Sequence, residues 1–212
     1  MKKFKFCSMQ LSGIIIFFLL LSLPACSQKN ENNKNEEKVV ESVKPKTNID
    51  DPEKVKALHE AALAGSTELV KSLLREGVDF DAVDVDGHTA LMYAAFNGHT
   101  DIARILLDLG ASTTAIDYAG RTALMYAATG PFPETVKLLI EMKSDPNAVD
   151  KEEYFTPLMH AAAEGHLEVV KILLENGADA SLKDIDGDTA ESFALQNGHG
   201  EIAEYIKSKG KK

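Results

Sequence analysis

The chain has 212 residues, with 33 Asp and Glu against 23 Lys and Arg and a formal net charge of −10. An acidic chain repels phosphate backbones, so we expect no nucleic acid among its partners. The only cysteines are Cys7 and Cys26, which excludes a disulfide, a thiolate nucleophile and a cysteine zinc site from residues 27–212.

Residues 1–25 have the pattern of an export signal. Three lysines among the first five residues precede the apolar run "IIIFFLLL", which is too short and too near the start for a permanent membrane helix. The following "LPAC" resembles the bacterial lipobox and predicts that Cys26 carries lipid. A secretory signal cut near Ala25 and an uncleaved anchor stay open as alternatives. Each interpretation exports the rest of the chain, and the lipobox predicts a membrane-anchored lipoprotein facing the periplasm or the cell exterior of a bacterium.

Residues 26–50 are expected to form the lipidated N-terminus and a disordered tether. They are rich in Asn, Glu and Lys and offer almost nothing to bury, so they cannot offset the entropy of ordering. Without residues 1–25 the chain has 20 basic and 33 acidic residues, a charge of −13. This charge favours partners with a basic surface.

From residue 51 the chain repeats itself. "TALMYAA" stands at 89–95 and again at 122–128, and "TPLMHAA" follows at 156–162. The segments after them are also alike, as in "TDIARILLDLGASTTAID" at 100–117 and "LEVVKILLENGADASLKD" at 167–184. A fixed period of about 33 residues is typical of a solenoid in which each unit buries its faces against its neighbours.

These strings resemble the ankyrin repeat, with its turn D-x-x-G-x-T-P-L, a first helix with A-A, then G-H and a second helix with V-V-K-L-L. The resemblance implies an all-α ankyrin-repeat solenoid of about five helix-turn-helix units with β-turn or hairpin tips, at residues 51–210. The expected units are 51–84, 85–117, 118–150, 151–184 and 185–210.

The residue types fit this fold. Thr89 can cap a helix, and Leu91, Ala94 and Ala95 then fall on one helical face. Asp51 and the proline after it give an N-cap and a first helical residue, and unit five has the polar residues of a solvent-facing end cap. The sequence leaves open whether Met92, Met125 and Met159 are exposed.

Two stretches depart from the pattern. "GPFPE" at 130–134 takes the place of "NGHTD" at 97–101, which predicts a fixed turn and a shortened first helix. Lys143 stands where another unit has Gly110, which predicts strain at that helix end. The turn "DKEEYFT" has one extra residue.

We expect no enzyme, cofactor or metal site. His99, His166 and His199 recur at one repeat position, which favours a hydrogen bond at the inter-helix turn over metal binding, and one repeat of about 10 Å is too far to share an ion. "HEAAL" from His59 lacks the second histidine of a zinc-protease motif. The acidic turns are out of frame for a calcium loop.

The family's usual role implies protein binding through a concave surface of turn tips and first helices, by a monomer. Exposed aromatic residues bury a large area at little entropic cost. The alternative that some of these rings pack back onto neighbouring turns stays open. The candidate residues are Phe96, Asn97, Tyr118, Arg121, Tyr154, Phe155, Asp86, His88 and Glu164.

The first functional hypothesis is therefore a membrane-tethered, extracytoplasmic protein-binding module without catalysis. Exported bacterial ankyrin proteins that resemble this one include adaptors, immunity-type proteins that neutralise a toxin, and factors linked to peroxide stress. An enzyme or metal protein and a purely structural spacer are the competing classes.

Overall fold

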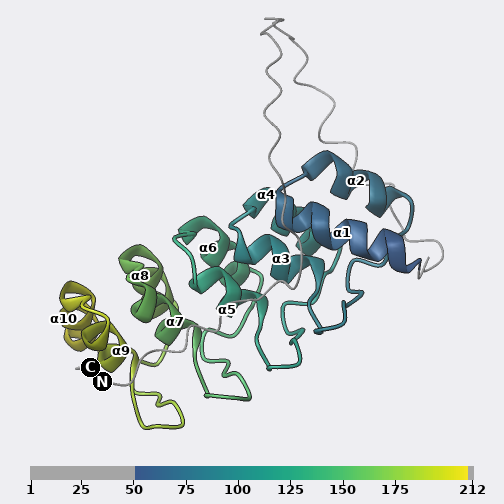
Figure 1. Cartoon of the computed structure of the whole chain (residues 1–212). Helices are drawn as coiled ribbons and strands as arrows, with labels where there is room; N and C mark the ends of the chain where they lie inside the picture. The colour runs from purple at the N-terminus through teal and green to yellow at the C-terminus, as the bar shows by residue number, and fades with distance from the viewer. Residues whose placement is uncertain (1–50, 210–212) are drawn as a thin grey trace, which may run out of the picture. The chain divides into compact units, whose positions relative to one another are not determined.

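The computed structural model describes residues 51–209, which lie within one compact unit, Ser42–Lys212. The signal, the tether and Cys26 fall outside these residues. The described part contains ten α-helices and no β-strand (Figure 1). The helices are α1 (Pro52–Ala64), α2 (Thr67–Arg75), α3 (Ala90–Phe96), α4 (Thr100–Asp108), α5 (Ala123–Ala128), α6 (Pro133–Glu141), α7 (Pro157–Glu164), α8 (Leu167–Glu175), α9 (Ala190–Gln196) and α10 (Gly200–Lys209).

The helices form five pairs that stack in chain order, which confirms the predicted helical-repeat solenoid. We number the repeats 1 to 5 by these pairs, α1–α2 to α9–α10. The first helices α1, α3, α5, α7 and α9 pack in one row, and the second helices α2, α4, α6, α8 and α10 pack in another. The connecting segments extend beyond the first helices (Figure 1). None of the helices in 51–209 has the length and apolar content that crossing a membrane requires.

The first helices of repeats 2 to 5 begin at a threonine, as predicted for Thr89. The Thr89 hydroxyl accepts a bond from the Met92 N–H at 3.3 Å, and the Met92 sulfur accepts one from the Thr89 N–H at 3.5 Å. Methionine thus takes the place of the acidic partner in a capping box. Met92, Met125 and Met159 are all buried, with 1–2 % exposure, which answers the question of their exposure.

The paired alanines lie where successive first helices touch. Ala94 and Ala95 are fully buried, and Leu91 beside them is 1 % exposed. Small side chains allow α3 to approach both α1 and α5 closely. The core is therefore a series of narrow layers between successive repeats.

Each connecting segment that leads to a first helix ends in a turn that we call the tip. The tips at 84–88, 117–121 and 184–188 are β-turns, and the tip at 150–155 is a wider bend. In the tip of repeat 2, Asp84 N–H bonds to His88 O and Gly87 N–H bonds to Asp84 O. The predicted β-turns are present, but the tips are too short for hairpin strands among the described residues.

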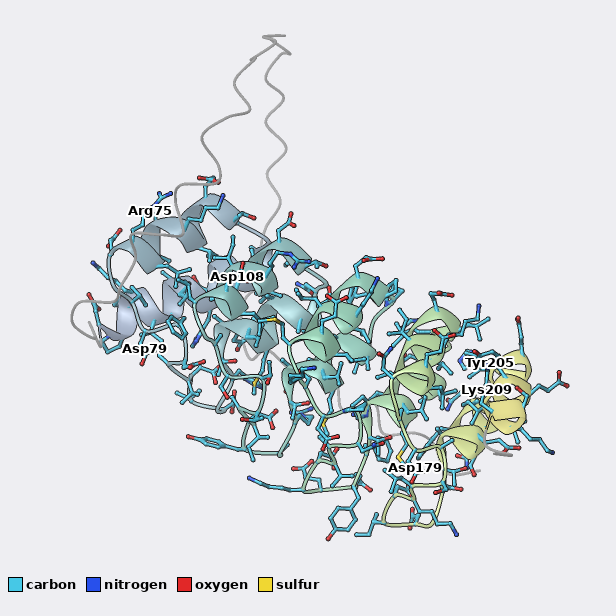
Figure 2. All side chains as sticks on the ribbon, turned by 180° about the vertical axis from the view of Figure 1, so that it is seen from behind. Arg75, Asp79, Asp108, Asp179, Tyr205 and Lys209 are labelled. Carbon is cyan, nitrogen blue, oxygen red and sulfur yellow. The ribbon has the colours of Figure 1, made fainter. Side chains whose placement is uncertain are left out.

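Repeat 1 has no tip in the described residues. Its first helix, α1, has 13 residues where α3 has 7, and it begins at the position that is the tip in later repeats. Asp51 is its N-cap and accepts from the Glu53 N–H, as predicted. At the other end of the stack, α10 places Tyr205 and Lys209 side by side on its surface (Figure 2), with the ammonium 5.4 Å from the ring centroid.

The inter-helix turns are tied to the preceding repeat by histidine. His99 Nε2 lies 3.1 Å from Leu63 O, and His166 Nε2 lies 3.1 Å from Thr129 O. These bonds confirm the predicted structural role of the "GH" position. In repeat 3, where Phe132 replaces this histidine, the ring packs against Gly98 and Gly130 instead, and α5 has only 6 residues.

Among residues 51–209, two residues other than glycine have positive φ. Lys143 has φ 71°, which confirms the strain expected where Gly110 stands in repeat 2. Tyr154 has φ 59° and takes the place of the tip glycine in the lengthened turn of repeat 4.

Candidate functional site

A buried polar cluster lies at the base of the tips of repeats 2 and 3. The Tyr93 hydroxyl donates to Asp84 Oδ2 at 2.5 Å, and the Tyr126 hydroxyl donates to Asp117 Oδ2 at 2.5 Å. These tyrosines are the fifth residues of the two "TALMYAA" copies. Each one fastens its own first helix to its own tip.

His88 joins the two halves of this cluster. Its Nδ1 lies 3.2 Å from Asp84 Oδ2, and its Nε2 lies 3.0 Å from the Tyr126 hydroxyl oxygen. Carboxylates only accept hydrogen bonds, and the single Tyr126 hydroxyl proton goes to Asp117, so both ring nitrogens must donate. The nearby Asp117 carboxylate, whose Oδ2 lies 3.6 Å from His88 Nε2, and then the contacts with Asp84 raise the pKa of His88 against the effect of burial. A charged histidine therefore links repeat 2 to repeat 3.

Arg121 completes the cluster on the repeat 3 side. Its Nε donates to Asp117 Oδ2 at 2.9 Å, and its guanidinium lies 5.1 Å from the centroid of Tyr126. Burial alone raises the pKa of Asp117, but the ion pair with His88 and the hydrogen bonds from Tyr126 and Arg121 outweigh it and hold the pKa well below its ordinary value. Asp117 is thus an anion at all ordinary pH values.

The series Asp84, His88, Tyr126 has the order of a catalytic relay, yet it does not activate a nucleophile. Burial and the bond to Asp117 raise the pKa of Tyr126 far above its ordinary value of 10.0. The hydroxyl is buried and donates its hydrogen bond to the Asp117 carboxylate. A protonated phenol in this setting is a structural donor.

Repeat 4 lacks this cluster. His160 stands where repeats 2 and 3 have tyrosine, and Phe155 stands where they have His88 and Arg121. Asp150 accepts from the backbone N–H groups of Glu153 at 2.9 Å and Phe155 at 3.3 Å. His160 Nε2 is buried and has no hydrogen-bond partner among the described residues. Burial lowers the pKa of His160 to about 4, with Asp150 raising and Arg121 lowering it.

Five of the predicted site residues are exposed. The side chains of Tyr118 and Tyr154, on the tips of repeats 3 and 4, are 69 % and 48 % exposed. Asp86 on the tip of repeat 2, Asn97 after α3 and Glu164 at the end of α7 are exposed as well.

The other predicted residues pack back onto their neighbours. Phe96 is half-buried with its ring 6.1 Å from Tyr126, and Phe155 is half-buried between His160 and Phe193, at 5.4 and 4.8 Å between centroids. The Arg121 side chain is 22 % exposed. The alternative of rings packed onto neighbouring turns therefore describes Phe96 and Phe155.

His88 requires a correction. It was expected at an exposed tip, but it is only 6 % exposed because Asp84 and Tyr126 hold its ring inside the cluster. His88 positions the tip and offers no surface to a partner.

The structure brings the predicted residues of repeats 2 and 3 together. Tyr118 N–H bonds to Asp86 O at 3.1 Å, and His88 and Arg121 meet at Asp117. Asn97 donates to Leu63 O at 2.7 Å, so this exposed residue also ties α3 to repeat 1. Tyr154, Phe155 and Glu164 belong to repeat 4.

Asp84, Asp86 and His88 could offer three metal ligands, with ligand atoms within 4.8 Å of one another. However, Asp84 Oδ1 already accepts the N–H groups of Asp86 and His88, and Oδ2 accepts Tyr93 and the His88 ring. Donors within the protein therefore satisfy the Asp84 carboxylate, and this group of residues is a hydrogen-bonded turn.

The roles of Asp84, Asp117, Tyr93 and Tyr126 were not predicted from the sequence. A signal was present, because aspartate and tyrosine are nine residues apart in both repeats. In repeat 4 the inserted residue and His160 break that spacing.

The stacked helix pairs and the tips define a helix-turn-helix repeat protein. A family model described as "Ankyrin repeats (3 copies)" matches residues 25–117, 58–150 and 124–212. These matches together cover most of the chain, so the chain belongs to the ankyrin-repeat family, whose members are protein-interaction modules and typically not catalysts. A search of curated proteins finds no match.

Proposed function

We propose that this protein binds another protein on the surface made of the tips and first helices, while lipid on Cys26 holds it on a bacterial membrane, facing the periplasm or the cell exterior. The observation that carries the binding role is the exposure of Tyr118 and Tyr154, 69 % and 48 %, beside Tyr93 and Tyr126, which are 9 % and 4 % exposed. An exposed tyrosine on a rigid frame is a low-entropy anchor for a partner.

The membrane tether is supported by the sequence at the start of the chain. A lysine-rich start, an apolar run and "LPAC" precede a polar segment of about 24 residues before Asp51. Each buried CH₂ of an acyl chain contributes about 0.8 kcal/mol, so several chains anchor a protein firmly. The polar segment gives the repeats reach to meet a partner beside the membrane.

The binding role is tested by capture from detergent-solubilised membranes, with the full mature chain as bait. The double variant Tyr118→Ala/Tyr154→Ala should lose the partner while its helical circular dichroism stays unchanged. Tyr205→Ala is the matched control, because Tyr205 lies on α10 at the end of the stack (Figure 2). Equal recovery of one partner by the double variant and by the wild type would exclude the proposed surface. The identity of the partner decides between an adaptor, an immunity protein and a stress-support factor.

The anchor is tested separately by Cys26→Ala. Acyl labelling should disappear and the protein should move to the soluble fraction. Retention of the variant in the membrane pellet after a carbonate wash would contradict lipidation at Cys26.

A further inference from the structure

Exposed large hydrophobic side chains are concentrated in and just before the tips. Among the residues that the structure describes there are ten such side chains, and seven lie in these segments. The seven are Val83, Val85, Ile116, Tyr118, Val149, Tyr154 and Ile185. The other three, Leu69, Met142 and Leu195, lie on or directly after helices in different repeats. Scattered single residues need no explanation, but a concentration of this kind marks an interaction surface.

Six of the seven follow a strict alternation. In repeat 2, Val83 and Val85 are exposed while Asp84 between them turns into the polar cluster. Ile116 and Tyr118 flank the buried Asp117 in the same way. Alternate residues of an extended segment point to opposite sides. The aspartates that build the cluster therefore force their neighbours outward.

The extended segments form two exposed rows, which we call the arm surface. Its first row is Val83, Ile116, Val149 and Lys183, and its second row is Val85, Tyr118, Lys151 and Ile185. No member of the first row was predicted as a site residue from the sequence. Repeats 2 and 3 contribute only apolar residues, whereas repeats 4 and 5 each contribute one lysine.

Backbone hydrogen bonds hold the extended segments of the arm surface in register. Tyr118 N–H bonds to Asp86 O at 3.1 Å, Lys151 N–H to Ala119 O at 2.8 Å, and Ile185 N–H to Glu153 O at 3.0 Å. The Tyr118 ring also lies across Gly87, where a Cβ would come within 3.1 Å of Cδ1. A partner would therefore meet a surface whose backbone is already held in place, and little backbone conformational entropy would be lost on binding.

The charge around the arm surface is mostly negative. The exposed carboxylates on the tips are those of Asp86, Glu152, Glu153 and Asp186, against the ammonium groups of Lys151 and Lys183. Residues 51–209 carry 28 acidic and 13 basic residues, a formal charge of −15. This charge disfavours a second copy of the chain and favours a basic partner.

We propose that the arm surface binds a protein segment that combines apolar side chains with lysine or arginine. The apolar side chains pack on Val83, Val85, Ile116 and Tyr118, and the basic groups face Asp86, Glu152 and Glu153. This inference rests on the proposed protein-binding function and specifies its partner. It adds the row of Val83, Ile116 and Val149 to the tyrosines.

The test uses a random dodecamer peptide library displayed on phage, selected on the full mature chain. The inference expects enriched peptides that carry both apolar and basic residues and bind more weakly as NaCl rises from about 50 to about 300 mM, since salt screens exposed charges. The variant Val83→Lys/Ile116→Lys should lower the affinity for these peptides at least tenfold. The control Leu69→Lys/Met142→Lys adds the same charge at exposed positions elsewhere and should change binding less than twofold.

Other outcomes separate this inference from the proposed function. If Tyr118→Ala/Tyr154→Ala abolished binding of the selected peptides but Val83→Lys/Ile116→Lys left it intact, the arm surface would be overturned and the binding function kept. Acidic peptides, or no enrichment at all, would overturn the inference. A dimer in analytical ultracentrifugation that Val83→Lys/Ile116→Lys dissociates would assign the arm surface to a second copy of the chain and overturn the basic partner.

Discussion

Repeats 3 and 4 have nearly the same first helix but hold their tips differently. In repeat 3 the Oδ2 atom of the tip aspartate Asp117 meets the side chains of Tyr126, Arg121 and His88. In repeat 4 the equivalent Asp150 accepts backbone N–H groups, while His160 leaves its Nε2 buried and without a partner among the described residues. One tip is fastened to its neighbours and the other mainly to itself.

This difference comes from one residue of the repeated segment and from the length of the turn before it. The tyrosine of "TALMYAA" is long enough to reach the aspartate, but the histidine of "TPLMHAA" is shorter and the inserted residue reshapes the turn. The two histidines therefore have opposite protonation. His88 has a raised pKa because two carboxylates surround it, whereas burial lowers the pKa of His160 to about 4.

The largest expected effect is the loss of the Asp117 carboxylate. Asp117→Asn removes the acceptor that neutralises His88 and Arg121, and should lower the free energy of unfolding by about 3 kcal/mol. Asp150→Asn is the matched control in repeat 4 and should cost about 1 kcal/mol, because neutral N–H donors are satisfied more easily. Urea unfolding followed by circular dichroism measures both. Equal losses would remove the distinction between the two tips.

The next effect is the acid sensitivity that His160 confers. Its pKa is lower in the folded chain than its ordinary 6.5, so the unfolded chain binds the proton first and stability falls as the pH drops from 6.5 towards 4. The loss from this residue should be about 2 kcal/mol between about pH 7 and pH 5. His160→Tyr restores the residue of repeats 2 and 3 and should abolish this part of the pH dependence. An unchanged stability difference between pH 7 and pH 5 would show that His160 is not buried and neutral.

A smaller effect concerns the ends of the second helices of repeats 2 and 3, α4 and α6. Lys143 has φ 71°, and its counterpart Gly110 has φ 101°, where an added Cβ would meet no atom within 4 Å. Lys143→Gly should therefore stabilise the chain by about 1 kcal/mol, and Gly110→Ala should destabilise it by a similar amount through backbone strain alone. Thermal unfolding of the pair gives both signs. A loss of stability in Lys143→Gly would mean that the lysine side chain outweighs the backbone strain.

The smallest expected effect is the loss of stability at higher pH that His88 contributes. Its pKa is raised above the ordinary 6.5, so its stabilisation is complete below pH 6.5 and is lost as the pH rises through the folded value. Asp84, Asp117, Tyr93 and Tyr126 are the groups around it. His88→Asn should flatten the decline in stability above pH 6.5, and an unchanged slope would contradict a charged His88.

The repeats themselves could be predicted from the sequence, because each unit restates the same cap, the same apolar spacing and the same small residues. Thr89, Ala94 and Ala95 act as expected, and the strain at Lys143 followed from its glycine counterparts. The outward or inward direction of tip side chains could not be predicted in this way. His88 is buried because Tyr126, which is 38 residues away, reaches it.

The first exposed row was missed for a related reason. Val83 and Ile116 look like core residues by type, and their exposure follows only once Asp84 and Asp117 are known to point inward. The sequence identified Tyr118 and Tyr154 as surface residues, but not Val83, Ile116 and Val149. Apolar residues in a turn are ambiguous until their polar neighbours have been assigned.

The contrast between the two tips is measured most directly by the ¹⁵N chemical shifts of the His88 and His160 rings, followed by NMR from about pH 4 to pH 8 in the folded chain. We predict that at pH 7 both His88 nitrogens have the shifts of a protonated imidazolium, while His160 has those of a neutral ring that gains its proton only near pH 4. A neutral His88 at pH 7, or a His160 that titrates near 6.5, would contradict the polar link between repeats 2 and 3 and its absence from repeat 4.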